Sequence, residues 1–279
     1  MDKIFVPPIK IQGIKTKLLP LIKQNILPLD ELLWVEPFMG SGVVGFNLRP
    51  RQALFADNNP HLIEFYNALK FEKISSHLVK VFLTEQGKIL SERGEKYYYE
   101  VRERFNKFHK PLDFLFLNRS CFNGLIRFNR EGKFNVPYGH KPQRFSKAYV
   151  TKIVNQIRYV EECLLCFDWI FRCQDFRETL KQVDNSGKSF IYCDPPYIGR
   201  HVDYYNSWNE KDERTLCEML KISSKRFMIS TWLQNKFRFN SCVEDIWKFC
   251  RKARQEHFYH VGAKEINRNS IVEAVLMNY

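Results

Sequence analysis

The sequence of 279 residues predicts an α/β protein, with a mostly parallel mixed sheet, helices on both of its faces and a mainly helical insertion that carries a hairpin. Two observations lead to this fold class. Short apolar runs typical of buried strands alternate with segments of helical periodicity, which favours parallel strands joined by helices. A block between about residues 71 and 160 interrupts that alternation with charged, aromatic and helical sequence.

The strand candidates are apolar runs, several of which end in an acidic residue or a proline. They cover residues 34–38, 52–57, 164–173, 189–194, 226–231, 257–261 and 271–277. Helical spacing of apolar residues predicts helices over 60–71, 175–183 and 210–222, and a further helix after Gly42.

The middle block has a different character. Residues 95–109 are charged and aromatic, 111–128 are apolar with helical periodicity, and 130–133 form a predicted turn between extended segments. We therefore expect one catalytic domain formed by residues 1–70 and 160–279, and an inserted domain formed by residues 71–159.

Composition excludes several classes of protein. With 44% hydrophobic and 27% charged residues the chain is neither disordered nor low in complexity, and it has no apolar run of the ~20 residues that a membrane span needs. The N-terminus lacks the apolar core of a secretory signal, so we expect a cytoplasmic protein. The eight cysteines are scattered, and the close pair Cys163 and Cys166 has no second pair to complete a zinc site. We therefore expect reduced thiols and no metal.

The charge is concentrated in the insertion. The net charge of the chain is +13, and residues 101–160 hold 13 basic against 3 acidic residues. Phenylalanines such as Phe105, Phe122 and Phe134 are interleaved with these cations. A basic face of this kind is typical of a polyanion-binding surface, with a merely solvated face as the alternative.

A glycine-rich turn follows the first predicted strand. In Glu36-Pro37-Phe38-Met39-Gly40-Ser41-Gly42 the two glycines would let the backbone approach a ligand at the carboxyl edge of the sheet. Asp57 ends the next strand, where a carboxylate can accept hydrogen bonds from both hydroxyls of a ribose. No Gly-Lys-Ser/Thr follows, which disfavours a nucleoside triphosphate, and an ordinary tight turn remains the alternative.

The strand over 189–194 runs into Asp194-Pro195-Pro196-Tyr197, where two prolines must leave the sheet in a rigid turn. The Asp194 carboxylate and the Pro195 carbonyl could accept both hydrogens of an exocyclic amino group such as that of adenine. This would free the nitrogen lone pair for in-line attack by positioning rather than by a strong base. Tyr197 could stack on a base that has left its duplex. The alternative is a plain strand end with a surface tyrosine.

Together these motifs resemble the Dam family of DNA adenine methyltransferases, the D12 class in the alpha group, over nearly the whole chain. The resemblance implies an α/β methyltransferase fold, S-adenosylmethionine as cofactor with S-adenosylhomocysteine as product, and catalysis by Asp194, Pro195, Pro196 and Tyr197. The cofactor residues it implies are Lys10, Gly13, Lys15, Glu36, Pro37, Phe38, Gly40, Ser41, Gly42, Asp57, Asn58, Asp175, Phe176 and Asp194. The chain departs from the family at Ile11 and Ile14, where a tryptophan and a glycine are usual.

The basic insertion resembles the family's target-recognition segment from Asn118 to Gly139. The resemblance implies that Arg127 reads a guanine, that Phe122 wedges into the base stack, and that Asn123 and Pro137 contact bases. Phosphate contacts are expected from Arg130, Lys133, Lys141 and Arg144. The resemblance also implies that Asn118, Arg119 and Asn135 contact DNA. A further DNA-contacting hairpin is expected around 262–269.

The expected activity is therefore site-specific methylation of a flipped-out adenine in duplex DNA at a short site containing GA, with GATC as the leading candidate. The chain would act as a monomer, with a restriction endonuclease as a functional partner in some settings. Two alternatives stay open. An RNA methyltransferase could use the same Asp194-Pro195-Pro196-Tyr197 chemistry, and a non-catalytic DNA-binding relative could retain the fold.

Overall fold

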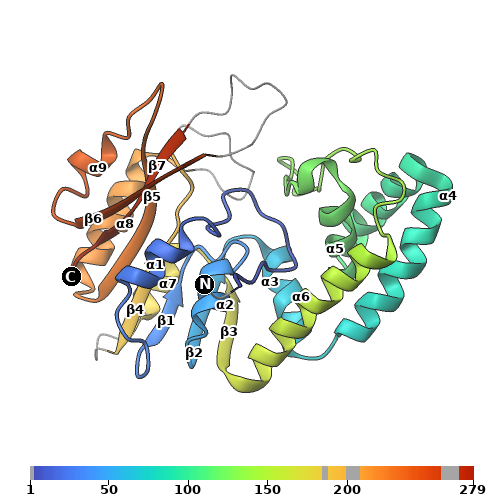
Figure 1. Cartoon of the computed structure of the whole chain (residues 1–279), viewed down its shortest axis with the longest axis horizontal. Helices are drawn as coiled ribbons and strands as arrows, with labels where there is room; N and C mark the ends of the chain where they lie inside the picture. Colours follow the sequence, from blue (N-terminus) through green and yellow to red (C-terminus); the bar gives the residue numbers. More distant parts are fainter. Residues whose placement is uncertain (1–2, 184–187, 199–207, 259–269) are drawn as a thin grey trace.

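The computed structural model describes residues 3–183, 188–198, 208–258 and 270–279. Within these ranges a seven-stranded sheet has the order β3-β2-β1-β4-β5-β7-β6 (Figure 1). The strands β1 to β5 are parallel, while β7 runs antiparallel to both β5 and β6. The bounds are β1 (Leu33–Glu36), β2 (Gln52–Asp57), β3 (Asp168–Cys173), β4 (Ser189–Cys193), β5 (Arg226–Asn235), β6 (Arg251–Phe258) and β7 (Ser270–Met277).

Side-chain alternation along the strands builds a core on each face of the sheet. In β1, Trp34 belongs to one buried apolar cluster and Val35 to the other, and β4 divides Phe190 from Ile191 in the same way. Successive side chains of a strand point to opposite faces, so strands buried on both faces are apolar throughout. The mixed sheet with helices on both faces is therefore confirmed.

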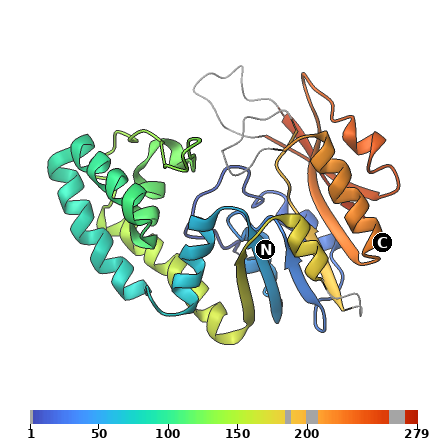
Figure 2. The ribbon, with the colours of Figure 1, turned by 180° about the vertical axis from the view of Figure 1, so that it is seen from behind.

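The helices divide between these two clusters. One face carries α1 (Leu19–Asn25), α2 (Val43–Leu48) and α3 (Pro60–Lys70), and the other carries α7 (Phe176–Gln182), α8 (Glu210–Ile222) and α9 (Cys242–Asp245). Figure 2 shows α7 and α8 from behind. The predicted helices over 60–71, 175–183 and 210–222 agree with α3, α7 and α8 to within one residue at each end, whereas α1 and α9 were not predicted.

The middle of the chain forms a helical layer beside β3 (Figures 1 and 2). It contains α4 (Ser76–Phe108), α5 (Pro111–Ser120), the short 3-10 helix η1 (Phe122–Gly124) and α6 (Lys147–Cys166). Gly94 has φ of +55° and breaks the regular backbone of α4. The apolar faces of α4, α5 and α6 belong to the same buried cluster as Trp34 of β1.

Several element predictions differ from the structure at their ends. The strand predicted over 34–38 ends at Glu36, and the strand predicted over 226–231 continues to Asn235. Leu164 to Cys166 complete α6, so β3 begins at Asp168 rather than at Leu164. The helix predicted over 111–128 stops at Ser120, because Asn123 and Gly124 have positive φ and the Phe122 N–H donates to the Pro137 carbonyl. The last but one strand begins at Arg251, six residues before the predicted start, and residues 259–261 lie outside the described part.

The turn predicted at 130–133 is present. Phe128 and Phe134 form an antiparallel bridge, and the Asn129 N–H donates to the Lys133 carbonyl. In the described part of the chain no helix has both the length and the apolar character that crossing a membrane requires. All eight cysteines are free thiols.

Candidate active site

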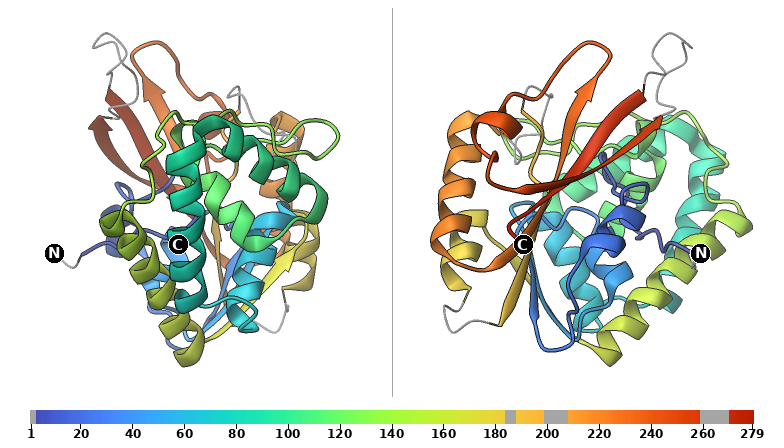
Figure 3. Two further views of the ribbon diagram at one scale, coloured as in Figure 1. Left: turned by 90° about the vertical axis from the view of Figure 1, so that its right-hand side faces the viewer. Right: turned by 60° about the vertical axis from the view of Figure 1, so that its left-hand side comes forward.

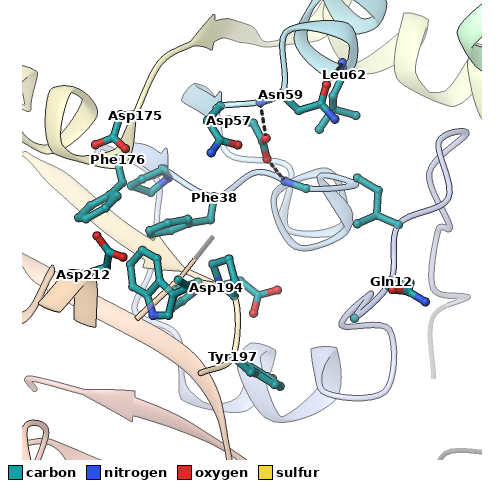
Figure 4. Close-up of a pocket in the computed structure, with 18 of the residues that line it drawn as sticks. Gln12, Phe38, Asp57, Asn59, Leu62, Asp175, Phe176, Asp194, Tyr197 and Asp212 are labelled. Atoms are coloured by element: carbon teal, nitrogen blue, oxygen red, sulfur yellow. Dashed lines mark hydrogen bonds between the residues drawn. The ribbon is translucent and has the colours of Figure 1, made fainter. Parts of the chain in front are cut away.

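A cavity of about 300 Å³ lies where the carboxyl ends of β1, β2 and β4 meet (Figure 4). This is the edge at which open parallel sheets bind ligands. Thirteen of the predicted catalytic and cofactor residues line it: Gly13, Lys15, Pro37, Phe38, Gly40, Asp57, Asn58, Asp175, Phe176, Asp194, Pro195, Pro196 and Tyr197. Segments from both halves of the chain, up to 184 residues apart, therefore converge on one cavity.

Asp57 anchors the glycine-rich turn. Its Oδ2 accepts a hydrogen bond from the Gly40 N–H at 2.9 Å, and its Oδ1 accepts one from the Asn59 N–H at 2.9 Å. Both bonds are dashed in Figure 4. Burial raises the pKa of the Asp57 carboxyl, and these N–H donors oppose the rise. The carboxylate retains acceptor capacity, since its two oxygens together can accept about four hydrogen bonds.

Gly42 shapes the same turn. It has φ of +74°, a left-handed conformation that glycine adopts without strain. A Cβ at this position would lie 2.9 Å from the Met39 side chain and 3.0 Å from that of Phe46. The turn therefore requires glycine here, although Gly42 itself does not line the cavity.

Three aromatic rings form one wall of the cavity. Phe38 stacks on Phe176 with ring centroids 5.3 Å apart, and Trp208 meets Phe38 edge-on at 5.4 Å. The Trp208 indole donates from Nε1 to Glu213 Oε2 at 2.6 Å, which fixes its orientation. Sequence reasoning missed Trp208, for which the available signal was a large aromatic residue directly before the capping Asn209 of a predicted helix.

Asp175 lies at the rim of this wall. It caps α7 by accepting a bond from the Arg177 N–H at 2.8 Å, and the Arg177 guanidinium pairs with both Asp175 and Asp212. Arg177 and Asp212 also line the cavity, and neither was predicted. The wall therefore ends in a network of two carboxylates bridged by one arginine.

Among the described residues, neighbouring side chains hold one of the two carboxylate oxygens of Asp194. Its Oδ1 lies 2.9 Å from Lys15 Nζ and accepts a bond from Ser230 Oγ at 2.8 Å. Burial raises the pKa of the Asp194 carboxyl and the Lys15 ammonium opposes that rise. Among the described residues no hydrogen bond to Oδ2 is present, so this oxygen is available as an acceptor. Ser230 was missed, although the predicted strand over 226–231 would place it beside Asp194.

Tyr197 is fixed at both its hydroxyl and its ring. The hydroxyl donates to Glu273 Oε1 at 3.0 Å, and Glu273 Oε2 lies 2.9 Å from Nε2 of His257 on β6. Lys15 Nζ lies 5.0 Å from the centroid of the tyrosine ring. Sequence reasoning missed Glu273, because only the pairing of β7 with β5 brings it within hydrogen-bond distance of Tyr197.

Four predicted cofactor residues do not line the cavity. Glu36 is buried and accepts from Trp34 Nε1 at 2.9 Å, and burial raises its pKa to about 8. Ser41 is buried, and its carbonyl accepts from the Tyr66 hydroxyl. The backbone N–H and C=O of Lys10 pair with the Asn118 side chain, while Gly42 shapes the turn. These four residues lie outside the cavity lining, and their contacts are to other parts of the protein.

Comparison with known proteins identifies the family. The model of the D12 class N6 adenine-specific DNA methyltransferases matches residues 12–266. The chain belongs to this family. A DNA adenine methylase of Escherichia coli K12 is 35% identical over 195 residues, 68% of this chain and 64% of that protein, so the match spans less than two thirds of its length.

A DNA adenine methylase of Vibrio cholerae O1 is 32% identical over 238 residues, 81% of this chain and 80% of that protein. Among solved structures, an rRNA methyltransferase, AviRa from Streptomyces viridochromogenes, aligns over 94% of this chain and 83% of its own, with 13% identity and a TM-score of 0.40. The α/β fold of this D12 family member is defined by its own seven-stranded mixed sheet with helices on both faces.

The predicted recognition segment, residues 118–139, begins at the end of α5 and continues as a loop region in which exposed and buried side chains are mixed. Phe122 is 48% exposed, and Asn123, Arg127 and Pro137 are also exposed. The Arg127 guanidinium donates to the Asn135 side chain at 2.7 Å and to its carbonyl at 3.0 Å. The cations Arg130, Lys133 and Lys141 are exposed, with Lys133 paired to Glu131.

The structure buries Asn118 and Arg119, which were predicted to contact DNA. Their exposed fractions are 0% and 3%. Asn118 bonds the Lys10 backbone, and Arg119 donates to the Pro8 carbonyl at 2.7 Å and to Gln156 Oε1 at 2.6 Å. Arg144 is also engaged, since it donates to the Arg119 carbonyl and the Tyr149 hydroxyl. Asn118 and Arg119 therefore join the predicted recognition segment to the N-terminal segment, while Arg144 bonds Arg119 and Tyr149.

The hairpin expected at 262–269 lies outside the described residues. In the described ranges no group of three histidine, cysteine or acidic side chains is arranged to hold a metal ion.

Proposed function

We propose that this chain transfers a methyl group from S-adenosylmethionine to the exocyclic amino group of adenine in duplex DNA. The observation that carries the proposal is the asymmetric restraint of Asp194: Lys15 and Ser230 hold Oδ1, while Oδ2 is available beside Pro195. Asp194 Oδ2 and the Pro195 carbonyl would each accept one hydrogen of the adenine amino group. This would direct the nitrogen lone pair for in-line attack on the methyl group.

The cavity fits the proposed methyl donor. Asp57 offers carboxylate acceptors for ribose hydroxyls, and the wall of Phe38, Phe176 and Trp208 offers aromatic faces to an adenine ring. When bound, S-adenosylmethionine supplies an electrophilic methyl group on a sulfonium cation. The residues of the chain then orient both partners and exclude water, and Tyr197, held by Glu273, would stack on the flipped target base.

We infer that the target is a short duplex site containing GA, with GATC as the leading candidate. Arg127 would read the guanine, Phe122 would replace the flipped base in the stack, and Asn123 and Pro137 would contact neighbouring bases. Arg130, Lys133 and Lys141 would contact phosphates. We further infer a monomeric, cytoplasmic enzyme, consistent with eight free thiols, which a restriction endonuclease accompanies in some settings.

The deciding experiment is transfer of labelled methyl from S-adenosylmethionine to unmethylated plasmid DNA and to total RNA, followed by mapping of the modified bases. Methyladenine confined to one short DNA motif supports the proposal and names the target. Label in RNA alone would make the chain an RNA methyltransferase. Label in neither, with DNA binding retained, would favour the non-catalytic alternative.

Arg127→Ala is expected to reduce discrimination at one guanine position by about 1–3 kcal/mol, because a bidentate arginine contact to guanine contributes that much. Overall duplex binding should persist, since the other cations of the segment remain. The measurement is kcat/KM on duplexes that differ only at that guanine. An equal loss on every duplex would make Arg127 a phosphate contact.

Asp57→Ala is expected to weaken binding of S-adenosylmethionine by roughly 10²-fold, since it removes charge-assisted hydrogen bonds and releases the Gly40 turn. Calorimetric titration with S-adenosylhomocysteine measures the effect without catalysis. Asp175→Ala is the matched comparison: its carboxylate is already paired with Arg177, so a smaller loss is expected. Equal losses in both variants would contradict the role given to Asp57.

A further inference from the structure

The strand β5 ends in an exposed basic and aromatic turn that the proposed function does not use. We call residues 235–240 the β5 tip. Phe237 and Phe239 are 71% and 57% exposed, and Lys236 and Arg238 beside them are exposed as well. No acidic residue occurs between positions 234 and 241. Two exposed phenylalanines that alternate with two cations form a surface patch of the kind that binds a partner.

The β5 tip is a structured turn. Asn235 Oδ1 accepts from the N–H groups of Phe237 at 2.8 Å and Arg238 at 2.9 Å, and the Asn235 N–H donates to the Arg238 carbonyl. Asn240 closes the base by donating from its backbone to the Leu233 carbonyl. The turn thus presents its side chains in a fixed arrangement, which lowers the entropy lost on binding.

The position of the β5 tip relates it to the active site. Cys193 of β4 pairs with Ile229 of β5 in parallel register, so Asp194 lies level with Ser230 and the tip begins five residues further along β5. At about 3.3 Å per residue, the tip begins roughly 17 Å along the strand direction from the level of the catalytic turn. Figures 1 and 3 show this turn and the recognition segment rising above the same edge of the sheet, on opposite sides.

The cationic and aromatic side chains of the β5 tip favour an anionic partner that offers flat rings for stacking. Lys236 Nζ lies 5.8 Å from the Phe237 ring centroid, so cation and ring are presented together. Lysine and arginine bind phosphates, and aromatic side chains stack on bases and sugars. A second copy of the chain fits poorly, because each copy carries a net charge of +13.

We propose that the β5 tip is a second DNA-contacting element, which holds the duplex backbone on the side of the active site opposite the recognition segment. This inference rests on the proposed function. Lys236 and Arg238 would contact phosphates, while Phe237 and Phe239 would pack on sugars or on bases exposed near the flipped adenine. The contact would add affinity without reading sequence.

The test compares the tip variant Lys236→Gln/Arg238→Gln with the matched control Arg51→Gln/Lys188→Gln. The control removes the same charge directly before β2 and β4, at the amino ends of the parallel strands and away from the active site. Fluorescence anisotropy with a labelled 30-base-pair duplex carrying one site gives the Kd between 50 and 300 mM KCl. For the tip variant we expect Kd to rise about tenfold at low salt and the slope of log Kd against log salt to fall by about 2. The control should stay near wild type.

Phe237→Ala/Phe239→Ala is expected to raise Kd by about five- to tenfold with an unchanged salt slope, since stacking does not release counterions. At saturating DNA the kcat of both tip variants should equal that of the wild type. If both bind DNA like the control, the inference is wrong while the proposed function stands. A kcat defect at saturation, or a changed oligomeric state on size-exclusion chromatography, would also overturn it.

If the wild-type chain neither binds nor methylates duplex DNA, the proposed function itself is wrong. This outcome is distinct from a result in which only the tip variants behave like the control.

Discussion

Asp194→Ala is expected to lower the rate of methyl transfer by about 10³-fold or more while S-adenosylmethionine binding stays nearly intact. The substitution removes the Oδ2 acceptor that we assign to the adenine amino group, and fixed polar groups of this kind contribute factors of about 10²–10³ each. It also leaves the Lys15 ammonium without its partner at 2.9 Å, which adds to the loss. The measurement is single-turnover methyl transfer at saturating DNA, with cofactor affinity measured in parallel by calorimetry.

Ser230→Ala is the graded comparison for this prediction. It removes one of the two groups that hold Oδ1 but leaves the carboxylate in place, so a loss of about tenfold is expected. Its neighbour Tyr192, which donates to Ser230 Oγ at 3.0 Å, would lose that acceptor, so thermal stability should be measured as well. Turnover near wild type in Asp194→Ala would exclude the proposed mechanism.

The second large effect concerns stability and pH. Burial raises the pKa of Glu36 from an unfolded value of 4.5 to about 8. Below pH 4.5 Glu36 is protonated in both the folded and the unfolded state, and its full contribution to the free energy of unfolding is present. As pH rises from 4.5 to 8 the unfolded chain releases a proton that the folded chain retains, so the folded state loses stability. The shift corresponds to at most about 5 kcal/mol.

Glu36→Gln should therefore flatten the fall in the free energy of unfolding between pH 5.5 and 8.5. Urea unfolding at several pH values measures it, and the difference between the two proteins isolates Glu36 from the other buried carboxyls. Glu31→Gln is the control, because that side chain is 81% exposed and should leave the pH profile unchanged. Identical pH profiles for wild type and Glu36→Gln would show that Glu36 titrates normally.

Local sequence predicted the centre of the site well. The apolar runs that end in Asp57 and Asp194 are strands, and Gly40 and Gly42 both have positive φ. These features depend on residues within about ten positions of one another. Strand periodicity and the backbone demands of glycine and proline act over that range, so they are visible in a single sequence.

The contacts that the sequence could not predict join residues over long sequence separations. Arg119 looked like a DNA contact because its neighbours resemble a recognition motif, but Pro8, 111 positions away, accepts its Nε–H bond. Glu273 reaches Tyr197 across 76 positions through the pairing of β7 with β5. No local pattern encodes such pairings, because they depend on how the sheet is assembled.

The shared apolar core of the sheet and the helical layer has a consequence for engineering. Trp34 of β1 and Phe105, Phe116 and Ile157 of the layer belong to one buried cluster, and Asn118 and Arg119 tie α5 to residues 8–10. The proposed recognition segment therefore cannot be exchanged between relatives on its own. A chimera that transplants residues 118–139 from a relative should fold well only if residues 8–10 and Gln156 are exchanged with it.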